Sequence, residues 1–164
     1  TMNVDGLKTG HTSGAGFNLI ASAVDGQRRL IAVVMGADSP KGREQQAAKL
    51  LHWGQQNFDT VQILHNGKKV GTERIWYGDK EQVKLGTDQD FWLALPKAEV
   101  PNIKAKYVLD KKELEAPIAA HQRVGEIQLY DRDKVVAHWP LVTLEAVDKA
   151  GLFSRLSDYL HHTL

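Results

Sequence analysis

Two apolar segments near the N-terminus, separated by only three residues, constrain the fold most strongly. They are GFNLIASAV at Gly16–Val24 and RRLIAVVM at Arg28–Met35, with Asp25-Gly26-Gln27 between them. Asp-Gly between apolar, β-branched segments is a strong β-hairpin signal. Because nearly every position is apolar, we expect both faces of these strands to be covered. Leu7–His11 is expected to add a third antiparallel strand.

A helix is expected directly after this sheet, at Pro40–Asn57. Ser39 can cap its N-terminus, Pro40 suits the first helical position, and Glu44 falls early, where a negative charge favours the helix dipole. An apolar stripe at helical spacing is expected to pack on the sheet, and it comprises Ala47, Leu50, Leu51 and Phe58, with Trp53 beside it.

After Phe58 the pattern changes to short strand candidates with turn signals such as Asn66-Gly67 between them. Evenly spaced short strands of this kind are typical of an all-β sandwich or barrel. The candidates are residues 60–64, 69–76, 82–85, 91–95, 103–108, 124–130 and 135–142.

The expected organisation therefore has three parts. Residues 1–57 form an α+β piece of antiparallel strands plus a helix, and residues 58–147 form an all-β, sandwich-like domain. Residues 148–164 form a linker and a short amphipathic helix, since Leu152, Phe153, Leu156, Tyr159 and Leu160 share one face.

Lys8-Thr9-Gly10 is the stretch that carries recognisable chemistry. The Lys8 ammonium would hold a carboxylate and favour an oxyanion, and the Thr9 hydroxyl would hydrogen-bond the same carboxylate. Gly10 lets a substrate backbone approach the strand edge. A plain structural interpretation, an exposed lysine at a strand end with a turn glycine behind it, remains open on these residues alone.

The wider stretch VDGLKTGHTSGAGFNLIASA resembles the third active-site motif of the low-molecular-mass penicillin-binding proteins, which are serine D-alanyl-D-alanine carboxypeptidases. The resemblance continues through SPKGREQQAAKLLHWG, where Gly42-Arg43-Glu44 matches a recurring GRE of that family. It then runs through IWYGD and KAKYVLDKKELEAPI to the end of the chain. Within the family, the chain looks most like the penicillin-binding protein 5 and 6 group, and within that group like the 6b paralogue.

The resemblance implies roles for five residues. Lys8, Thr9 and Gly10 would form the third motif, in which the threonine and Arg43 bind the terminal carboxylate of a stem peptide ending in D-Ala-D-Ala. The fork of the arginine guanidinium suits this because it meets a carboxylate with two parallel hydrogen bonds. The backbone N–H of His11 would be one of two oxyanion donors, and its imidazole is assigned no proton transfer. The alternative for Arg43 is an exposed helix arginine that pairs with a nearby acid.

The other motifs of that family do not occur in this sequence. The nucleophile and its base lie in Ser-x-x-Lys, and a second wall of the site lies in Ser-x-Asn. Ser13, Ser22, Ser39, Ser154 and Ser157 are the serines, and none has Lys three positions on or Asn two positions on. The chain alone is therefore expected to be inactive, as the C-terminal portion of a parent enzyme that penicillins acylate.

This expectation has a physical consequence for residues 1–57. Two apolar strands and an apolar-faced helix would lack most of their packing partners, and such a bare patch drives association. We expect these residues to be ordered only when they pair with another chain, either the missing N-terminal half or a second copy that exchanges elements.

Composition excludes several other classes. Lys plus Arg total 21 and Asp plus Glu total 20, so the net charge of +1 gives no footprint for nucleic acid. The absence of cysteine excludes disulfides, cysteine zinc sites and a thiol nucleophile. The seven histidines are scattered, so neither a metal nor a cofactor is expected. No signal peptide and no membrane span are expected in the sequence given.

Three functional hypotheses follow. The first is the C-terminal part of a periplasmic carboxypeptidase, peripheral on the inner membrane, whose terminal helix contacts the membrane surface weakly. The second is a non-catalytic β-sandwich spacer or interaction module, which is compatible with the first. The third is a β-lactamase-type hydrolase, which the long β-rich part disfavours.

Overall fold

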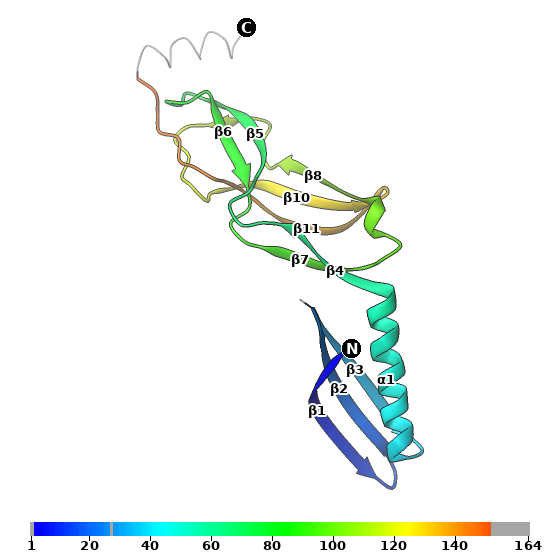
Figure 1. Ribbon diagram of the computed structural model, residues 1–164. Helices are drawn as coiled ribbons and strands as arrows, with labels where there is room; N and C mark the ends of the chain where they lie inside the picture. Colours follow the sequence, from blue (N-terminus) through cyan, green and yellow to red (C-terminus); the bar gives the residue numbers. More distant parts are fainter. Residues whose placement is uncertain (1, 27, 152–164) are drawn as a thin grey trace. The chain divides into compact units, whose positions relative to one another are not determined.

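The computed structural model describes residues 2–26 and 28–151, and these form two compact units (Figure 1). The sheet–helix unit comprises the residues up to Val61 together with Ala94–Val100. The β-rich unit comprises Gln62–Leu93 and the residues from Pro101 onward. These units are defined by which residues pack together, so they do not test the domain boundaries expected after residues 57 and 147, which stay predictions.

The sheet–helix unit contains the expected antiparallel sheet, with strand order β1-β2-β3. The strands are β1 (Asn3–Thr12), β2 (Gly16–Asp25) and β3 (Arg28–Ala37). The β1 strand extends beyond the predicted segment at both ends, because the whole length of β2 is available for pairing, from Asn3 opposite Val24 to Thr12 opposite Gly16.

The predicted helix is confirmed as α1 (Pro40–Asn57), which follows β3 in this unit (Figure 1). The Ser39 hydroxyl accepts a hydrogen bond from the Gly42 N–H at 3.0 Å, and Pro40 occupies the first turn as expected. At the other end, the Gln55 carbonyl accepts hydrogen bonds from the Arg28 guanidinium and the Lys97 ammonium, both at 3.0 Å. These cations satisfy a carbonyl that has no partner within the helix.

Only one face of this sheet is covered by α1. The buried cluster joins small residues of β2 and β3 to Ala47 and Leu51 of the helix. On the opposite face Ile31 is 61% exposed, Val33 55% and Met35 78%. The expectation that both faces are covered is therefore wrong for the chain as described. Leu50 and Trp53 are also exposed, because the contact between helix and sheet is narrow and centres on Ala47 and Leu51.

A two-stranded ribbon of β4 (Phe58–Leu64) and β7 (Phe91–Pro96) follows the helix. The β-rich unit then forms a six-stranded sheet of order β8-β10-β11-β6-β5-β9. All the strands expected from the sequence are present, and the bounds are β5 (Lys69–Trp76), β6 (Gln82–Gly86), β8 (Ile103–Leu109), β10 (Arg123–Asp131) and β11 (Lys134–Thr143). The sequence patterns missed β9 (Leu114–Glu115) and the 3-10 turn η1 (Val100–Asn102), which have only two and three residues.

This six-stranded sheet is strongly curled. Its edge strands β8 and β9 are joined only by Asp110–Glu113, so the connecting chain spans at most about 18 Å. A flat sheet would separate them by about 24 Å, at about 4.8 Å per strand. The curl also brings Tyr107 of β8 to β5, where its hydroxyl donates to Glu73 at 2.7 Å.

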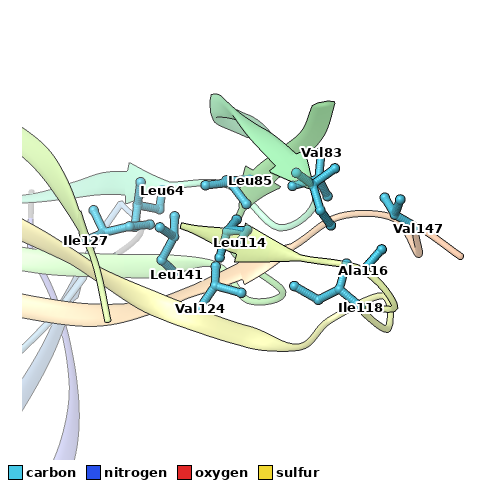
Figure 2. Close-up of a cluster of buried hydrophobic side chains, with 11 residues drawn as sticks. Leu64, Val83, Leu85, Leu114, Ala116, Ile118, Val124, Ile127, Leu141 and Val147 are labelled. Carbon is cyan, nitrogen blue, oxygen red and sulfur yellow. The ribbon is translucent and has the colours of Figure 1, made fainter. Parts of the chain in front are cut away.

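The curled sheet encloses a core of larger apolar side chains (Figure 2). Val83, Leu85 and Leu141 are fully buried, and Ile127 and Val147 are 2% and 1% exposed. The prediction of a mostly β architecture with one long helix is thus confirmed. The amphipathic helix predicted around Leu152–Leu160 lies outside the described residues. In the part of the chain that is described, no helix is long and apolar enough to cross a membrane.

Candidate functional site

Lys8-Thr9-Gly10 lies on β1, which is an edge strand of the three-stranded sheet. Lys8 pairs with Ile20, Thr9 with Leu19 and Gly10 with Asn18 of β2, and all three motif residues are exposed. An edge strand has backbone N–H and C=O groups that no neighbouring strand takes up. An extended peptide can therefore align along this strand.

Lys8 and Thr9 lie on opposite faces of the sheet, as neighbours on a strand must. Directly paired residues share a face, so Lys8 lies with Ile20 and Val33 on the exposed apolar side, and Thr9 lies with Leu19 on the helix side. The Lys8 ammonium donates to the Thr9 carbonyl at 3.1 Å, which brings its charge close to the strand.

An open depression of about 220 Å³ adjoins the motif on this sheet. Lys8, Thr9 and Gly10 form one side of it, and its remaining lining is mainly apolar, from Asn18, Leu19, Ile20, Val33, Val34 and Met35. A positive charge is thus placed beside an apolar surface at the sheet edge.

Arg43 reaches the same strand from the first turns of α1. Its Nη1 donates to the carbonyls of Gly10, at 3.4 Å, and Asn18, at 3.3 Å. Both contacts are long, and the buried Nε has no hydrogen-bond partner among the described residues. The guanidinium also lies 5.7 Å from the centre of the Phe17 ring. Its five donors are therefore only partly used, which leaves capacity for a carboxylate.

The His11 imidazole stacks on Phe17, with ring centres 4.0 Å apart and planes at 25°. Phe17 therefore contacts both His11 and Arg43. The imidazole is held by an aromatic contact.

Phe17 and Asn18 were not expected as site residues. The Asn18 side-chain oxygen accepts from the Gly36 N–H at 2.9 Å and so fixes the end of β3 beside the motif. The glycine-rich turn after His11 could have revealed them, because a tight turn there fixes the register that places Phe17 opposite His11. Gly16 in this turn has φ +64°, a backbone conformation that favours glycine.

Lys8 and Arg43 place two cationic groups beside β1. Two acids of the unit are paired with other arginines: the hydrogen bond from Arg29 lowers the pKa of Asp5, and the hydrogen bond from Arg28 lowers the pKa of Asp25. Neither acid neutralises Lys8 or Arg43 through an ion pair among the described residues. Within that same part of the chain, no three His, Asp or Glu side chains gather as metal ligands.

Two family models match the chain. The model described as "Penicillin-binding protein 5, C-terminal domain" matches residues 58–149. The model described as "D-alanyl-D-alanine carboxypeptidase" matches residues 1–39, which include Lys8-Thr9-Gly10.

Curated relatives match nearly the whole chain. D-alanyl-D-alanine carboxypeptidase DacD of Salmonella typhimurium is 82% identical over 99% of the chain, which covers 42% of that relative. DacA of Escherichia coli is 43% identical over 99% of the chain, and 41% of DacA is covered. The chain thus spans about two fifths of the length of these relatives.

Solved structures agree with this relationship. Penicillin-binding protein 5 from Haemophilus influenzae matches 90% of the chain, and 43% of that protein, with a TM-score of 0.79 at 44% identity. Penicillin-binding protein 6B from Escherichia coli matches 87% of the chain, and 35% of that protein, with a TM-score of 0.62 at 68% identity. The chain therefore belongs to the family of penicillin-binding protein 5, whose C-terminal domain its β-rich part represents.

Proposed function

We propose that this chain is part of a serine D-alanyl-D-alanine carboxypeptidase that trims peptidoglycan stem peptides and is acylated by penicillins. The observation that carries the proposal is the position of Arg43 beside the edge strand that holds Lys8-Thr9-Gly10, with guanidinium donors left over. Residues 1–57 then represent the last strands and helix of a transpeptidase-like catalytic domain.

In the proposed complex, the substrate peptide aligns along the free edge of β1. Its terminal carboxylate receives hydrogen bonds from the Arg43 guanidinium and the Thr9 hydroxyl, and the Lys8 ammonium adds an attractive charge. Gly10 allows the peptide backbone to come close, and the His11 backbone N–H donates to the carbonyl oxygen as negative charge develops on it.

The remaining chemistry comes from the rest of the parent enzyme. A serine hydroxyl there attacks the carbonyl of the penultimate D-alanine while a lysine base accepts its proton. The terminal D-alanine leaves with a proton on its nitrogen, and water then hydrolyses the ester to regenerate the serine. A penicillin forms the same kind of ester when the serine opens its lactam ring.

The rest of the parent also supplies the cover for the exposed sheet face. Ile31, Val33 and Met35 lie side by side on β3 with Ile20 of β2, and their exposure is unusual for large apolar side chains. We expect the missing N-terminal half to bury this face, or a second copy to do so when that half is absent. The proposed location is the periplasm, peripheral on the inner membrane, where peptidoglycan substrate is available.

A second role is favoured for residues 58–147. This part has its own core and contains none of the residues proposed for the active site. A non-catalytic spacer or interaction module, attached to the catalytic domain, accounts for such an arrangement.

The test uses the longer protein that contains this chain. Intact-mass spectrometry after incubation with benzylpenicillin should show one penicilloyl adduct on the longer protein and none on the 164-residue chain. Absence of an adduct on the longer protein would contradict the acyl-enzyme proposal.

Arg43→Ala in the longer protein should lower kcat/KM for a D-Ala-D-Ala peptide about 100-fold, because charge-assisted hydrogen bonds to the carboxylate are lost. Lys41→Ala removes an exposed cation from the same helical turn and should leave activity unchanged. If Arg43→Ala lowers the melting temperature and leaves kcat/KM unchanged, Arg43 merely braces β1 and β2.

A further inference from the structure

A second depression lies in the β-rich unit, where the chain crosses from edge strand β8 to edge strand β9. Its volume is about 240 Å³. It is lined by the crossing segment, by β9 and by the start of β10, and none of its residues belongs to the site around Lys8. We call it the seam groove, because it lies where the two edges of the curled sheet approach each other without pairing.

The floor of the seam groove is apolar. Leu114, Ile118 and Val124 contribute to it, and each is only 5–6% exposed because the rest of the side chain belongs to the core shown in Figure 2. The Ala116 N–H donates to the Trp76 carbonyl at 2.9 Å, and Ile118 pairs with Val147. Backbone hydrogen bonds to neighbouring segments therefore position the floor.

The rim carries charges of both signs, and they are not all compensated. Arg123 pairs with Asp110 at 3.6 Å and with Glu126 at 3.3 Å. By contrast, no hydrogen bond or ion pair among the described residues involves the side chain of Lys111 or of Glu115. The groove thus has one ammonium and one carboxylate that find no partner among the described residues, beside an apolar floor.

These two groups line the same small cavity but lie beyond ion-pair distance of each other. A ligand that carries both charges can bridge them, whereas a simple anion or cation would satisfy only one. The volume is below the range of about 300–1,000 Å³ that is usual for drug-sized ligands, so the ligand must be small.

From this combination we infer that the seam groove binds a small zwitterion, an amino acid or dipeptide with a free ammonium and a free carboxylate. The ligand carboxylate binds Lys111, the ammonium binds Glu115, and a small apolar side chain contacts Leu114 and Val124. The choice of D-alanyl compounds as probes rests on the proposed function, whose reaction releases D-alanine. The charges and the size of the seam groove suit a small zwitterion whatever reaction the parent protein catalyses.

Titration of the 15N-labelled chain with D-alanine and with D-Ala-D-Ala, followed by NMR, tests the inference. Saturable shifts are expected for the amides of residues 110–115 and 122–124, with dissociation constants in about the millimolar range. N-acetyl-D-Ala-D-Ala lacks the ammonium and D-alaninamide lacks the carboxylate, so each should bind about fivefold more weakly than the matching zwitterion.

Variants locate the two charged contacts. Lys111→Met and Glu115→Gln should each weaken binding about fivefold, whereas Lys112→Met removes the neighbouring exposed lysine, which does not line the groove, and should leave binding unchanged. The amide spectrum of each variant shows whether the fold is intact. Absence of saturable shifts in the native chain would overturn the inference, as would equal binding of all four compounds.

The outcome is independent of the penicillin experiment. Acylation of the longer protein by benzylpenicillin tests the roles of Lys8, Thr9 and Arg43. The Lys111→Met variant of that longer protein should be acylated at the native rate. A negative titration with normal acylation therefore removes the seam groove and leaves the proposed carboxypeptidase intact.

Discussion

The two units of this molecule differ in where they place their large apolar side chains. The core of the β-rich unit is built mainly from leucine, isoleucine and valine, which lie inside the curled sheet. The buried cluster of the sheet–helix unit contains seven residues, of which five are alanines: Ala21, Ala23, Ala32, Ala37 and Ala47.

In the sheet–helix unit many of the larger apolar side chains among the described residues are exposed. The exposed ones are Val4, Leu7, Ile20, Ile31, Val33, Met35, Leu50 and Trp53. Each alanine in place of leucine forgoes about 2 kcal/mol of burial, at about 0.8 kcal/mol per CH₂ group. The β-rich unit therefore has the composition of a self-contained core, whereas the sheet–helix unit has the composition of one layer of a larger fold.

The largest expected effect comes from the closest backbone approach in the β-rich unit. A Cβ atom on Gly125 would lie 2.1 Å from the Val108 carbonyl oxygen, so Gly125→Ala must separate β8 from β10. We expect a loss of about 4 kcal/mol in the free energy of unfolding, measured by urea denaturation. Gly14→Ala, which has open space around it in the other unit, should change stability by less than about 0.5 kcal/mol. Tolerance of Gly125→Ala would show that the strands are not closely packed.

A matched pair of truncations compares the two surfaces directly. Leu141→Ala removes a fully buried side chain of the β-rich core and should cost about 3 kcal/mol. Ile31→Ala removes a side chain that is 61% exposed and should cost less than about 1 kcal/mol in this chain. In the longer parent protein the cost of Ile31→Ala should rise. If Leu141→Ala and Ile31→Ala destabilise the isolated chain equally, the two units do not differ as described, because the sheet face must then already be covered.

Tyr107→Phe tests the contact between β8 and β5 that accompanies the curl of the β-rich sheet. This change removes the hydrogen bond that Tyr107 of β8 donates to Glu73 of β5, and it should cost about 1 kcal/mol. The same hydrogen bond raises the pKa of Tyr107 above its ordinary value of 10.0, so Glu73→Gln should shift the alkaline absorbance titration of this tyrosine downward. An unchanged titration would argue against the contact.

The smallest expected effect is on the stability of the folded state at acidic pH. The hydrogen bond from Lys80 lowers the pKa of Glu145 from its ordinary value of 4.5, so the ionised carboxylate stabilises the folded state. That stability is fully present above pH 4.5 and is lost as the pH falls through the lowered pKa. Glu145→Gln should therefore flatten the dependence of the melting temperature on pH below 4.5. A native-like acid profile in Glu145→Gln would exclude the Lys80 pair as its cause.

Most of the fold is predictable because its signals are local. The Asp25-Gly26 turn defines the β2–β3 hairpin, and Ser39 with Pro40 marks the start of α1. The strand β9 was missed because two residues provide no period, and it exists only through its pairing with Ile75 and Trp76. Exposure of the sheet face was anticipated only from the family resemblance, since Ile31 and Val33 have the composition of a buried strand.

The candidate site was predictable where it depends on residue type and less so where it depends on register. Lys8-Thr9-Gly10 and Arg43 are visible as motifs in the sequence. Phe17 contacts His11 because of strand pairing, so only the register set by the glycine-rich turn, and no feature of Phe17 itself, could indicate this position. The seam groove is still harder to predict from the sequence, because its position depends on which strands form the two edges of the curled sheet.

The position of β9 at the edge of the curled sheet also bears on the order in which the strands pair during folding. The β10–β11 hairpin is local in sequence and can form within microseconds, whereas β9 pairs in parallel with β5, far away along the chain. We therefore expect β9 to dock late in folding and its amides to exchange early with solvent. The seam groove would then exist only in fully folded molecules, so that a ligand bound there reports that folding is complete.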